Sequence, residues 1–348
     1  MLLESIRAEP CPRCAVCGSP GASLYDKLDD VLFGAPGSWS ISRCTNERCG
    51  LLWLDPQPLE KDIGRAYAEY FTHAPRSGNP GLTRKAFRRL KSSALRAQLG
   101  YRHAVSGPSW RLEAFVSHLY PGGRDALAAS AMFVNAPGRE GGSLLDIGCG
   151  AGDLMITMRD LGWHVTGVET DPQAAERALH RGLDVRNGGL EEARFAGASF
   201  DAVTMAHVIE HVHDPVRLLA ECSRILKPRG SLVILTPNSA SWGHRHFGRN
   251  WMPLDPPRHI RVHNRNNLRR LLEAAGLAPV RVVTLAINAN AVWSTSDEIR
   301  RTRSAGRSRI GPQRNLLAGM PSQMIERLML KLDPEAGEDL LAIATRAA

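Results

Sequence analysis

A glycine-rich loop directly after a short apolar run restricts the fold of this chain more than any other feature. Residues 143–154 read SLLDIGCGAGDL, in which 144–147 predict a buried parallel strand and the residues after 152 follow a helical pattern. The glycines between them are Gly148, Gly150 and Gly152. Glycines allow a tight turn and let the backbone approach a ligand at the carboxyl end of a strand, where open α/β sheets bind their ligands. The segment therefore predicts an α/β fold with a binding site at this loop.

Two carboxylates indicate what kind of ligand the loop takes. The spacing G-x-G-x-G differs from the G-x-G-x-x-G of dinucleotide-binding loops, and Asp146 precedes the first glycine. A carboxylate there would repel a pyrophosphate, but it suits a ligand with an ammonium or sulfonium charge. Glu169 ends the next predicted strand, 21 residues after Gly148, where a carboxylate can accept hydrogen bonds from both ribose hydroxyls. The pattern therefore favours a cationic ligand with a ribose over a dinucleotide.

Strand and helix signals alternate through the rest of the chain. Further strands are expected at 164–169, 183–188, 200–206, 231–237, 280–285 and 338–346. Asp171-Pro172 and Asp214-Pro215 mark the starts of two helices, and the first of these is expected to end at Gly182. The alternation predicts a doubly wound, mostly parallel, Rossmann-like sheet of seven strands with a long insertion at about 286–336.

Five of the seven cysteines lie within the first 49 residues and predict a structural zinc site. Two short-spaced pairs, each followed by glycine, can supply the four thiolates of a closed tetrahedral site. The expected ligands are Cys14, Cys17, Cys44 and Cys49. Cys11 also stands three residues before Cys14 and could replace Cys17, whereas a set of free thiols or a redox pair is the alternative to zinc. The prediction is a zinc ribbon over 1–58.

Several motifs occur together in an order that is similar to a known family. DIGCGAGDL, GVETDP, FDAVTMAHVIEHVHDP and RILKPRGSLVILTPN resemble class I S-adenosylmethionine-dependent methyltransferases, over about 141–348. RCTNERCGLLWLDPQP and WMPLDPPRHIRVHNRNNLRRLLEAAGL resemble a subgroup with an N-terminal zinc domain, which is similar to glycan, lipid, secondary-metabolite and quinone-type methyltransferases. The resemblance implies S-adenosylmethionine as cofactor and a methyltransferase sheet at 141–348.

The resemblance also implies roles for individual residues. The methionine part of the cofactor would lie against Asp146, Gly148, Gly150 and Gly152. Glu169 would hold the ribose, and Leu190 lies in the segment that faces the adenine. Ala206 and His207, at the end of the fourth strand, would sit beside the sulfonium.

Methyl transfer is an in-line displacement, and a hydroxyl or acidic C–H acceptor also needs a general base. Histidine has a suitable pKa, and the candidates are His259, in the segment Pro-Pro-Arg-His, then His207 and His211. His207, Glu210 and His211 have spacings that could also bring them together on a divalent metal, or they could simply close the cofactor pocket. Substrate contacts are expected from Tyr70, Asn238 and Arg258.

The positive charge lies mainly outside the predicted sheet. The chain has 44 Lys and Arg against 35 Asp and Glu, a net charge of +9. Residues 74–110 hold eight Lys or Arg and 300–314 hold six Arg, with no acid in either stretch. The first stretch predicts a basic helix within a connector or lid at 59–140. These segments would form the rim of an anionic acceptor site, with a plain solvated surface as the alternative.

The expected function is S-adenosylmethionine-dependent methyl transfer to a small-molecule, glycan or lipid-linked acceptor. An RNA methyltransferase is the first alternative, suggested by the zinc ribbon and the basic insertions, although no aromatic residues interleave with the basic runs. A noncatalytic cofactor-binding module is the second. No apolar run reaches the roughly 18 residues of a membrane span, and no secretory signal is evident, so a cytoplasmic protein is expected.

Overall fold

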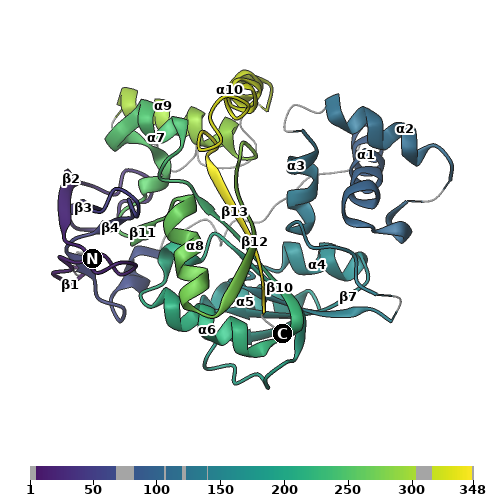
Figure 1. Ribbon diagram of the computed structural model, residues 1–348, viewed down its shortest axis with the longest axis horizontal. Helices are drawn as coiled ribbons and strands as arrows, with labels where there is room; N and C mark the ends of the chain where they lie inside the picture. The colour runs from purple at the N-terminus through teal and green to yellow at the C-terminus, as the bar shows by residue number, and fades with distance from the viewer. Residues whose placement is uncertain are drawn as a thin grey trace.

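A seven-stranded sheet forms the centre of the molecule (Figure 1). The computed structural model describes residues 5–67, 82–105, 107–119, 123–138, 140–302 and 316–346. The strands of the central sheet are β6 (Gly142–Ile147), β7 (Trp163–Glu169), β8 (Asp184–Asn187), β9 (Phe200–Ala206), β10 (Leu226–Pro237), β12 (Leu277–Leu285) and β13 (Asp339–Arg346). Their order is β12-β13-β10-β9-β6-β7-β8.

The strand directions confirm the predicted α/β fold. Strands β10, β9, β6, β7 and β8 are mutually parallel, whereas β13 runs antiparallel to both β10 and β12. The order places β6 between β9 and β7, so the chain leaves the middle of the sheet in two directions. Ligands of such sheets bind where that reversal occurs, at the carboxyl ends of the strands. The loop after β6 lies at this point.

Strands β6, β9 and β10 are buried on both sides because helices cover both faces of the sheet. The flanking helices are α4 (Asp153–Asp160), α5 (Pro172–His180), α6 (Pro215–Ile225) and α8 (Arg265–Ala274). The carboxylates of Asp171 and Asp214 cap α5 and α6 as predicted, accepting hydrogen bonds at 2.9 and 3.0 Å from backbone amides of the first turn. Helix α5 ends at His180, two residues before the expected Gly182.

The N-terminal strands form a separate four-stranded sheet that a late segment completes. It consists of β2 (Gly21–Leu28), β3 (Trp39–Cys44), β4 (Leu52–Leu54) and β11 (Arg261–Val262), while β1 (Ala8–Glu9) pairs with β5 (Gln57–Pro58). Strand β11 follows the Pro-Pro-Arg-His segment and pairs antiparallel with β4. The segment that was expected to carry the catalytic histidine is therefore anchored on the N-terminal sheet.

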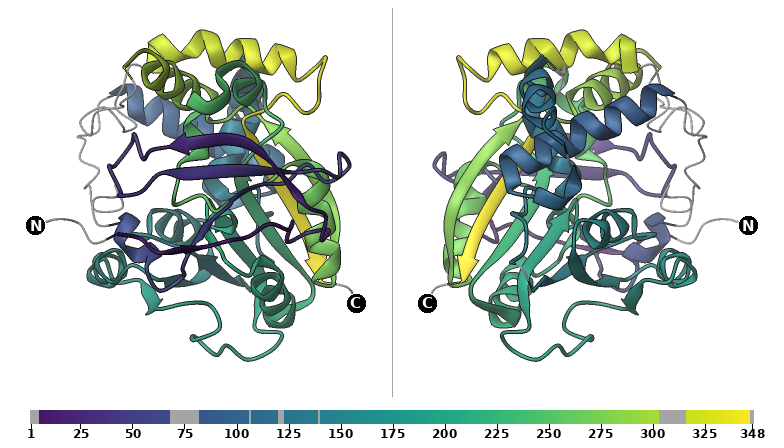
Figure 2. Two further views of the ribbon diagram at one scale, coloured as in Figure 1. Left: turned by 90° about the vertical axis from the view of Figure 1, so that its left-hand side faces the viewer. Right: turned by 90° about the vertical axis from the view of Figure 1, so that its right-hand side faces the viewer.

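The remaining helices lie around the carboxyl edge of the central sheet. They are α1 (Leu82–Leu99), α2 (Trp110–Val116), α3 (Gly123–Ala128), α7 (Trp242–Phe247), α9 (Ala289–Thr302) and α10 (Leu316–Met329). The 3₁₀ turns are Ile63–Tyr67, Arg102–Ala104, Ser117–Leu119, Ala129–Ala131, Ile209–His211, Gly248–Asn250 and Met252–Leu254. The N-terminal sheet and helices α1–α3 lie on opposite sides of the molecule (Figure 2). Within the described ranges, no helix combines the length and apolar character needed to cross a bilayer.

A buried arginine joins the N-terminal sheet to the segment after β10. The guanidinium of Arg258 contacts Asp30 at 2.7 and 2.8 Å and Asp255 at 2.5 and 3.0 Å. The side chains of Arg258 and Asp30 are fully buried and that of Asp255 is 6% exposed. Burial disfavours the charged guanidinium, but both carboxylates outweigh it and raise the pKa of Arg258. Removing one partner would leave a buried charge uncompensated.

We expect Arg258→Met to lower the free energy of unfolding by about 3–5 kcal/mol, because it leaves two buried carboxylates without their cation. Urea denaturation would measure the loss. The control is Arg245→Met, since Arg245 pairs with Asp333 at the surface, where both side chains are substantially exposed, and such pairs contribute at most about 1 kcal/mol. Equal losses in the two variants would contradict the importance of the buried pair.

Candidate functional site

The glycine-rich loop turns sharply between β6 and α4. Gly148, Gly150 and Gly152 all have positive φ, at 68°, 55° and 83°, a region that glycine adopts without strain. A Cβ at Gly148 would lie 2.5 Å from a methyl group of Val208, so this glycine is required by close packing. A Cβ at Gly150 would meet nothing within 4 Å. The backbone at Gly150 therefore borders open space, as a ligand-binding loop requires.

Glu169 lies against this loop. Its carboxylate accepts hydrogen bonds from the backbone amides of Gly150 at 2.7 Å and of Asp171 at 2.8 Å. One residue thus ties the end of β7 to the turn after β6. The arrangement holds a carboxylate at the carboxyl edge of the sheet, where a ribose would be recognised.

Asp146 lies beneath the loop and is 3% exposed. It accepts a hydrogen bond at 2.8 Å from the Thr204 hydroxyl. Burial raises the pKa of Asp146 to about 7, and the charge of Glu169 adds to this rise, although the Thr204 hydroxyl opposes it. A cationic ligand near the loop would favour the ionised carboxylate. The position therefore suits electrostatic stabilisation of a sulfonium better than direct contact with it.

A second group of ionisable side chains lies at the ends of β9 and β10. His207 follows β9 with a φ of 54°, and its Nδ1 lies 3.3 Å from the carboxylate of Glu210. Burial opposes protonation of His207, but the hydrogen bond and charge of Glu210 outweigh it and raise its pKa. Glu210 is fully buried and also accepts a hydrogen bond at 2.9 Å from the Thr236 hydroxyl. Burial favours its neutral form, yet the hydrogen bond with His207 and the nearby imidazoles lower its pKa to about 2.

The structure brings Glu210, His211 and His259 together. One carboxylate oxygen and one ring nitrogen from each histidine lie within 4.8 Å of one another. The imidazole rings of His211 and His259 meet edge to face, with centroids 4.7 Å apart. His259 takes the place that the sequence analysis gave to His207 in this group, because the Pro-Pro-Arg-His segment folds back over the turn after β9.

Backbone carbonyls fix the tautomers of both histidines. Nδ1 of His211 lies 2.9 Å from the carbonyl oxygen of Arg258, and Nδ1 of His259 lies 2.7 Å from that of Pro253. A carbonyl oxygen only accepts hydrogen bonds, so each Nδ1 carries a proton and each Nε2 is the basic atom. Nδ1 of His211 is also 2.9 Å from the Tyr67 hydroxyl. Burial and the nearby His259 lower the pKa of His211 to about 4, which keeps this ring neutral at pH 7.

The part of the chain that forms the carboxyl edge of the central sheet is similar in sequence to known proteins. A family model described as a methyltransferase domain matches residues 118–282. A ubiquinone biosynthesis O-methyltransferase of Cereibacter sphaeroides (strain ATCC 17025 / ATH 2.4.3) is 35% identical over 176 residues, which cover 45% of this chain and 69% of that protein. The chain belongs to the class I S-adenosylmethionine-dependent methyltransferases.

Two other similarities show how far the match extends. A protein of Mycolicibacterium smegmatis named as a probable S-adenosylmethionine-dependent methyltransferase is 36% identical over 138 residues, or 39% of this chain. The chain spans only about half, 52%, of that relative's length. The solved geranyl diphosphate C-methyltransferase of Streptomyces coelicolor A3(2) shares 21% identity, with a TM-score of 0.44 over 72% of this chain and 86% of that one.

Two predicted substrate contacts of the methyltransferase are corrected by the structure. Arg258 is fully buried between Asp30 and Asp255, so its guanidinium does not face an acceptor. Asn238 is also fully buried, and its amide nitrogen donates to the carbonyls of Glu335 and Gly337 at 2.8 and 2.7 Å. Both residues hold the backbone instead of reaching a binding site. The third predicted contact, Tyr70, lies outside the described residues.

Two other residues that were predicted to border the cofactor differ in exposure. Ala206 ends β9 and is partly exposed, whereas Leu190 is 4% exposed and packs in the apolar core. The sequence analysis missed Asp30, Asp255 and Thr204. Asp255 directly precedes the two prolines, and this position near the Pro-Pro-Arg-His segment is a weak signal for a role there. Nothing in the sequence pairs Asp30 with Arg258, which lies 228 positions later.

Four cysteine sulfurs of the methyltransferase form a compact cluster. The ligand atoms of Cys14, Cys17, Cys44 and Cys49 all lie within 4.8 Å of one another. Sγ of Cys14 is 3.6 Å from that of Cys49, and Sγ of Cys17 is 3.4 Å from that of Cys44. A tetrahedral zinc with Zn–S bonds of about 2.3 Å separates its sulfurs by roughly 3.8 Å. The donor set therefore fits zinc, whereas the Cys11 thiol faces the Arg13 carbonyl at 3.9 Å.

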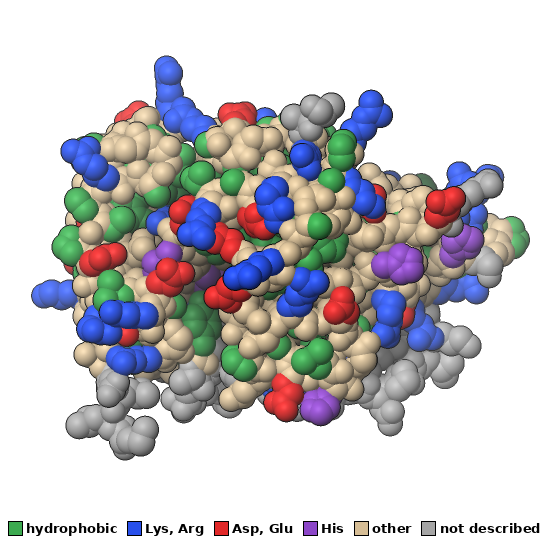
Figure 3. All heavy atoms as spheres, turned by 90° about the horizontal axis from the view of Figure 1, so that it is seen from below, with side chains coloured by type: hydrophobic (Ala, Val, Ile, Leu, Met, Phe, Trp, Pro, Cys, Tyr) green, Lys and Arg blue, Asp and Glu red, His purple; other side chains and the backbone are tan. Residues whose placement is uncertain are grey.

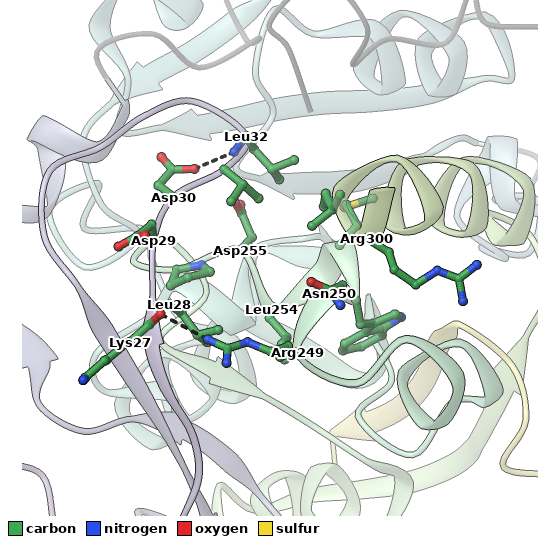
Figure 4. Close-up of a pocket in the computed structure, with 15 residues that line it drawn as sticks. Lys27, Leu28, Asp29, Asp30, Leu32, Arg249, Asn250, Leu254, Asp255 and Arg300 are labelled. Atoms are coloured by element: carbon green, nitrogen blue, oxygen red, sulfur yellow. Dashed lines mark hydrogen bonds between the residues drawn. The ribbon is translucent and has the colours of Figure 1, made fainter. Parts of the chain in front are cut away.

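A cavity of about 400 Å³ opens between the N-terminal sheet and α9 (Figure 4). Its lining comes from residues 27–32, 249–252, 254–256 and 299–300. It includes three cations, Lys27, Arg249 and Arg300, and three carboxylates, Asp29, Asp30 and Asp255. The carboxylate of Asp255 lies 3.9 Å from Nε2 of His259. The cavity is therefore adjacent to the histidine cluster and offers space for a polar molecule.

We expect Cys17→Ser to lose bound zinc, because a closed site needs all four thiolates, whereas Cys11→Ser should retain it. Zinc content per chain, measured by atomic absorption after purification without chelators, distinguishes the two. The opposite pattern would make Cys11 the fourth ligand.

The buried imidazole of His263 makes the free energy of unfolding depend on pH. It is fully buried, Nδ1 lies 3.0 Å from Asn267 Oδ1, and Nε2 has no partner among the described residues. Burial lowers its pKa to about 4. Since an unfolded histidine binds a proton near pH 6.5, the contribution of His263 is present above that pH and is lost as the pH falls toward 4.

The expected loss from His263 is about 2 kcal/mol at pH 5 relative to pH 8. In His263→Phe, urea denaturation at these two pH values should show a correspondingly smaller difference than in the parent chain. The exposed His103 provides the control, since His103→Phe should leave the pH dependence unchanged. An unchanged difference in His263→Phe would show that this ring titrates normally.

Proposed function

We propose that the protein transfers the methyl group of S-adenosylmethionine to a small-molecule acceptor, including glycan- or lipid-linked ones. The observation that carries the proposal is the placement of the cofactor loop and the histidine cluster on one edge of the sheet. Gly150 and Glu169 lie at the ends of β6 and β7, and His211 follows the adjacent β9. The family membership supports the cofactor, and the named activities of the relatives include O-methyl transfer.

The cofactor would be held from three sides. Glu169 would accept the ribose hydroxyls, the open backbone at Gly150 would approach the methionine part, and Asp146 would stabilise the sulfonium charge from beneath. Ala206 and His207, at the end of β9, would border the methyl group. The segment after β8 that contains Leu190 would face the adenine.

The cluster of Glu210, His211 and His259 would deprotonate the acceptor. The acceptor O–H, or an acidic C–H, gives its proton to Nε2 of a neutral histidine, and the freed electron pair attacks the methyl carbon. S-adenosylmethionine would supply the methyl group, and its sulfur would leave as a neutral thioether that keeps the electron pair of the C–S bond. Glu210 stabilises the imidazolium that forms, because a carboxylate with a pKa of about 2 remains charged throughout.

The cavity beside Asp255 would hold the acceptor. It lies next to His259, and its lining carries three cations and three carboxylates, which suits a polar acceptor. Its lining comes from both the N-terminal sheet and the segment after β10. The zinc ribbon would therefore contribute to the acceptor site by holding this wall in place.

The test begins by identifying the product. The purified protein is incubated with a cell extract and with S-adenosylmethionine labelled in its methyl group, and a product heavier by one CH₂ group is sought by mass spectrometry. We expect His211→Ala and His259→Ala to lower kcat by about 10²–10⁴-fold while the cofactor Kd stays unchanged, because only proton removal is affected. Glu169→Ala should instead weaken cofactor binding in calorimetry.

His180→Ala is the matched control, because His180 is largely exposed on α5 and should leave both parameters unchanged. Full activity in His211→Ala and His259→Ala would rule out the proposed base. Absence of cofactor binding by the parent chain would rule out methyl transfer itself.

A further inference from the structure

Helix α2 exposes three large apolar side chains on one face. Leu112, Phe115 and Val116 are 67%, 70% and 41% exposed, and their spacing of three and four residues places them side by side. The opposite side of the helix is packed, since Ala114 and Ser117 are buried. A cluster of this kind costs free energy in water and marks an interaction surface.

The surroundings of this face are strongly basic. Residues 82–128 hold nine Lys or Arg and only two Asp or Glu, in a chain whose total net charge is +9. Of the two acids, Glu113 is neutralised by Arg89 at 2.6 Å. Arg88, Arg102 and Arg111 are exposed. Lys, Arg and His side chains with an acidic neighbour stand at the end of the molecule that carries α1 and α2, and hydrophobic side chains are visible at its tip (Figure 3).

We propose that α1 and α2 form a docking surface for the anionic face of a lipid bilayer. Leu112, Phe115 and Val116 would enter the boundary between head groups and acyl chains, and the arginines would contact lipid phosphates. Two of the three exposed side chains, Leu112 and Val116, are aliphatic and offer no ring for base stacking, which favours lipid over RNA. The positive charge favours an anionic surface over a second copy of this chain, which would bring like charges together.

Another exposed apolar face does not carry the same inference. Helix α10 also exposes Met324, Ile325 and Leu328, but only two cations, Arg327 and Lys331, accompany them, against nine in residues 82–128. The proposal for α2 does not depend on the proposed methyl transfer. If both hold, the docking surface would bring the protein to acceptors that reside in a membrane.

The test measures binding of the full chain to vesicles of phosphatidylcholine, with and without phosphatidylglycerol, by co-sedimentation. We expect binding only to the vesicles with phosphatidylglycerol, and weaker binding at high salt. Leu112→Ser combined with Phe115→Ser should lower the partition coefficient by at least about tenfold, since two apolar side chains no longer leave water. Arg88→Gln, Arg102→Gln and Arg111→Gln together should lower it by about a hundredfold at low salt.

Val280→Ser is the matched control, because Val280 is 66% exposed on β12 and lies outside the basic segment. Its binding should equal that of the parent chain. Cofactor binding by each variant shows that it is folded, and it also separates failure of this proposal from failure of the proposed function. Absent binding, or equal binding to both kinds of vesicle, would overturn the proposal. The proposal would also be overturned if the Leu112 and Phe115 changes abolished dimerisation or RNA binding but left vesicle binding unchanged.

Discussion

The buried contact of Arg258 with Asp30 and Asp255 holds the candidate site together. One guanidinium satisfies a carboxylate from the N-terminal sheet and another from its own loop, 228 and 3 residues away. Without it, both carboxylates would be buried with no cation beside them. The same residue offers its backbone carbonyl to His211, and the next residue is His259. An interaction that is remote from the cofactor loop thus places both histidines.

The N-terminal sheet also positions the segment that carries His259. It receives β11, and the carbonyl of Cys49 in the cysteine cluster accepts hydrogen bonds from Asn264 and Asn267 at 2.8 and 3.0 Å. The Pro-Pro-Arg-His segment is therefore anchored through the residues that directly follow it. Histidines that donate Nδ1–H to rigid carbonyls keep one tautomer, so their basic atoms stay available without rearrangement.

Sequence reasoning was most accurate where the signal is local. All seven strands of the central sheet were expected close to their observed bounds, and both Asp-Pro caps are present, because these depend on short-range patterns. It was wrong for Arg258 and Asn238, which were expected to contact substrate. Polar residues near a predicted binding edge look alike in sequence, whether they face a ligand or a buried partner. The grouping of His259 with Glu210 was also not foreseen, since 48 residues separate them. The division into 1–58, 59–140 and 141–348 remains a prediction.

The sequence by itself determined the α/β class, the cofactor loop at Gly148–Gly152 with Glu169 beside it, and the four cysteines of the cluster, because each is written in residue type and spacing over a few positions. Only the tertiary structure decided which charged groups are buried, which of them pair, and which nitrogen of each histidine is basic. Those outcomes depend on desolvation and on partners contributed by segments far apart in the chain. Residue spacing alone carries no information about such partners.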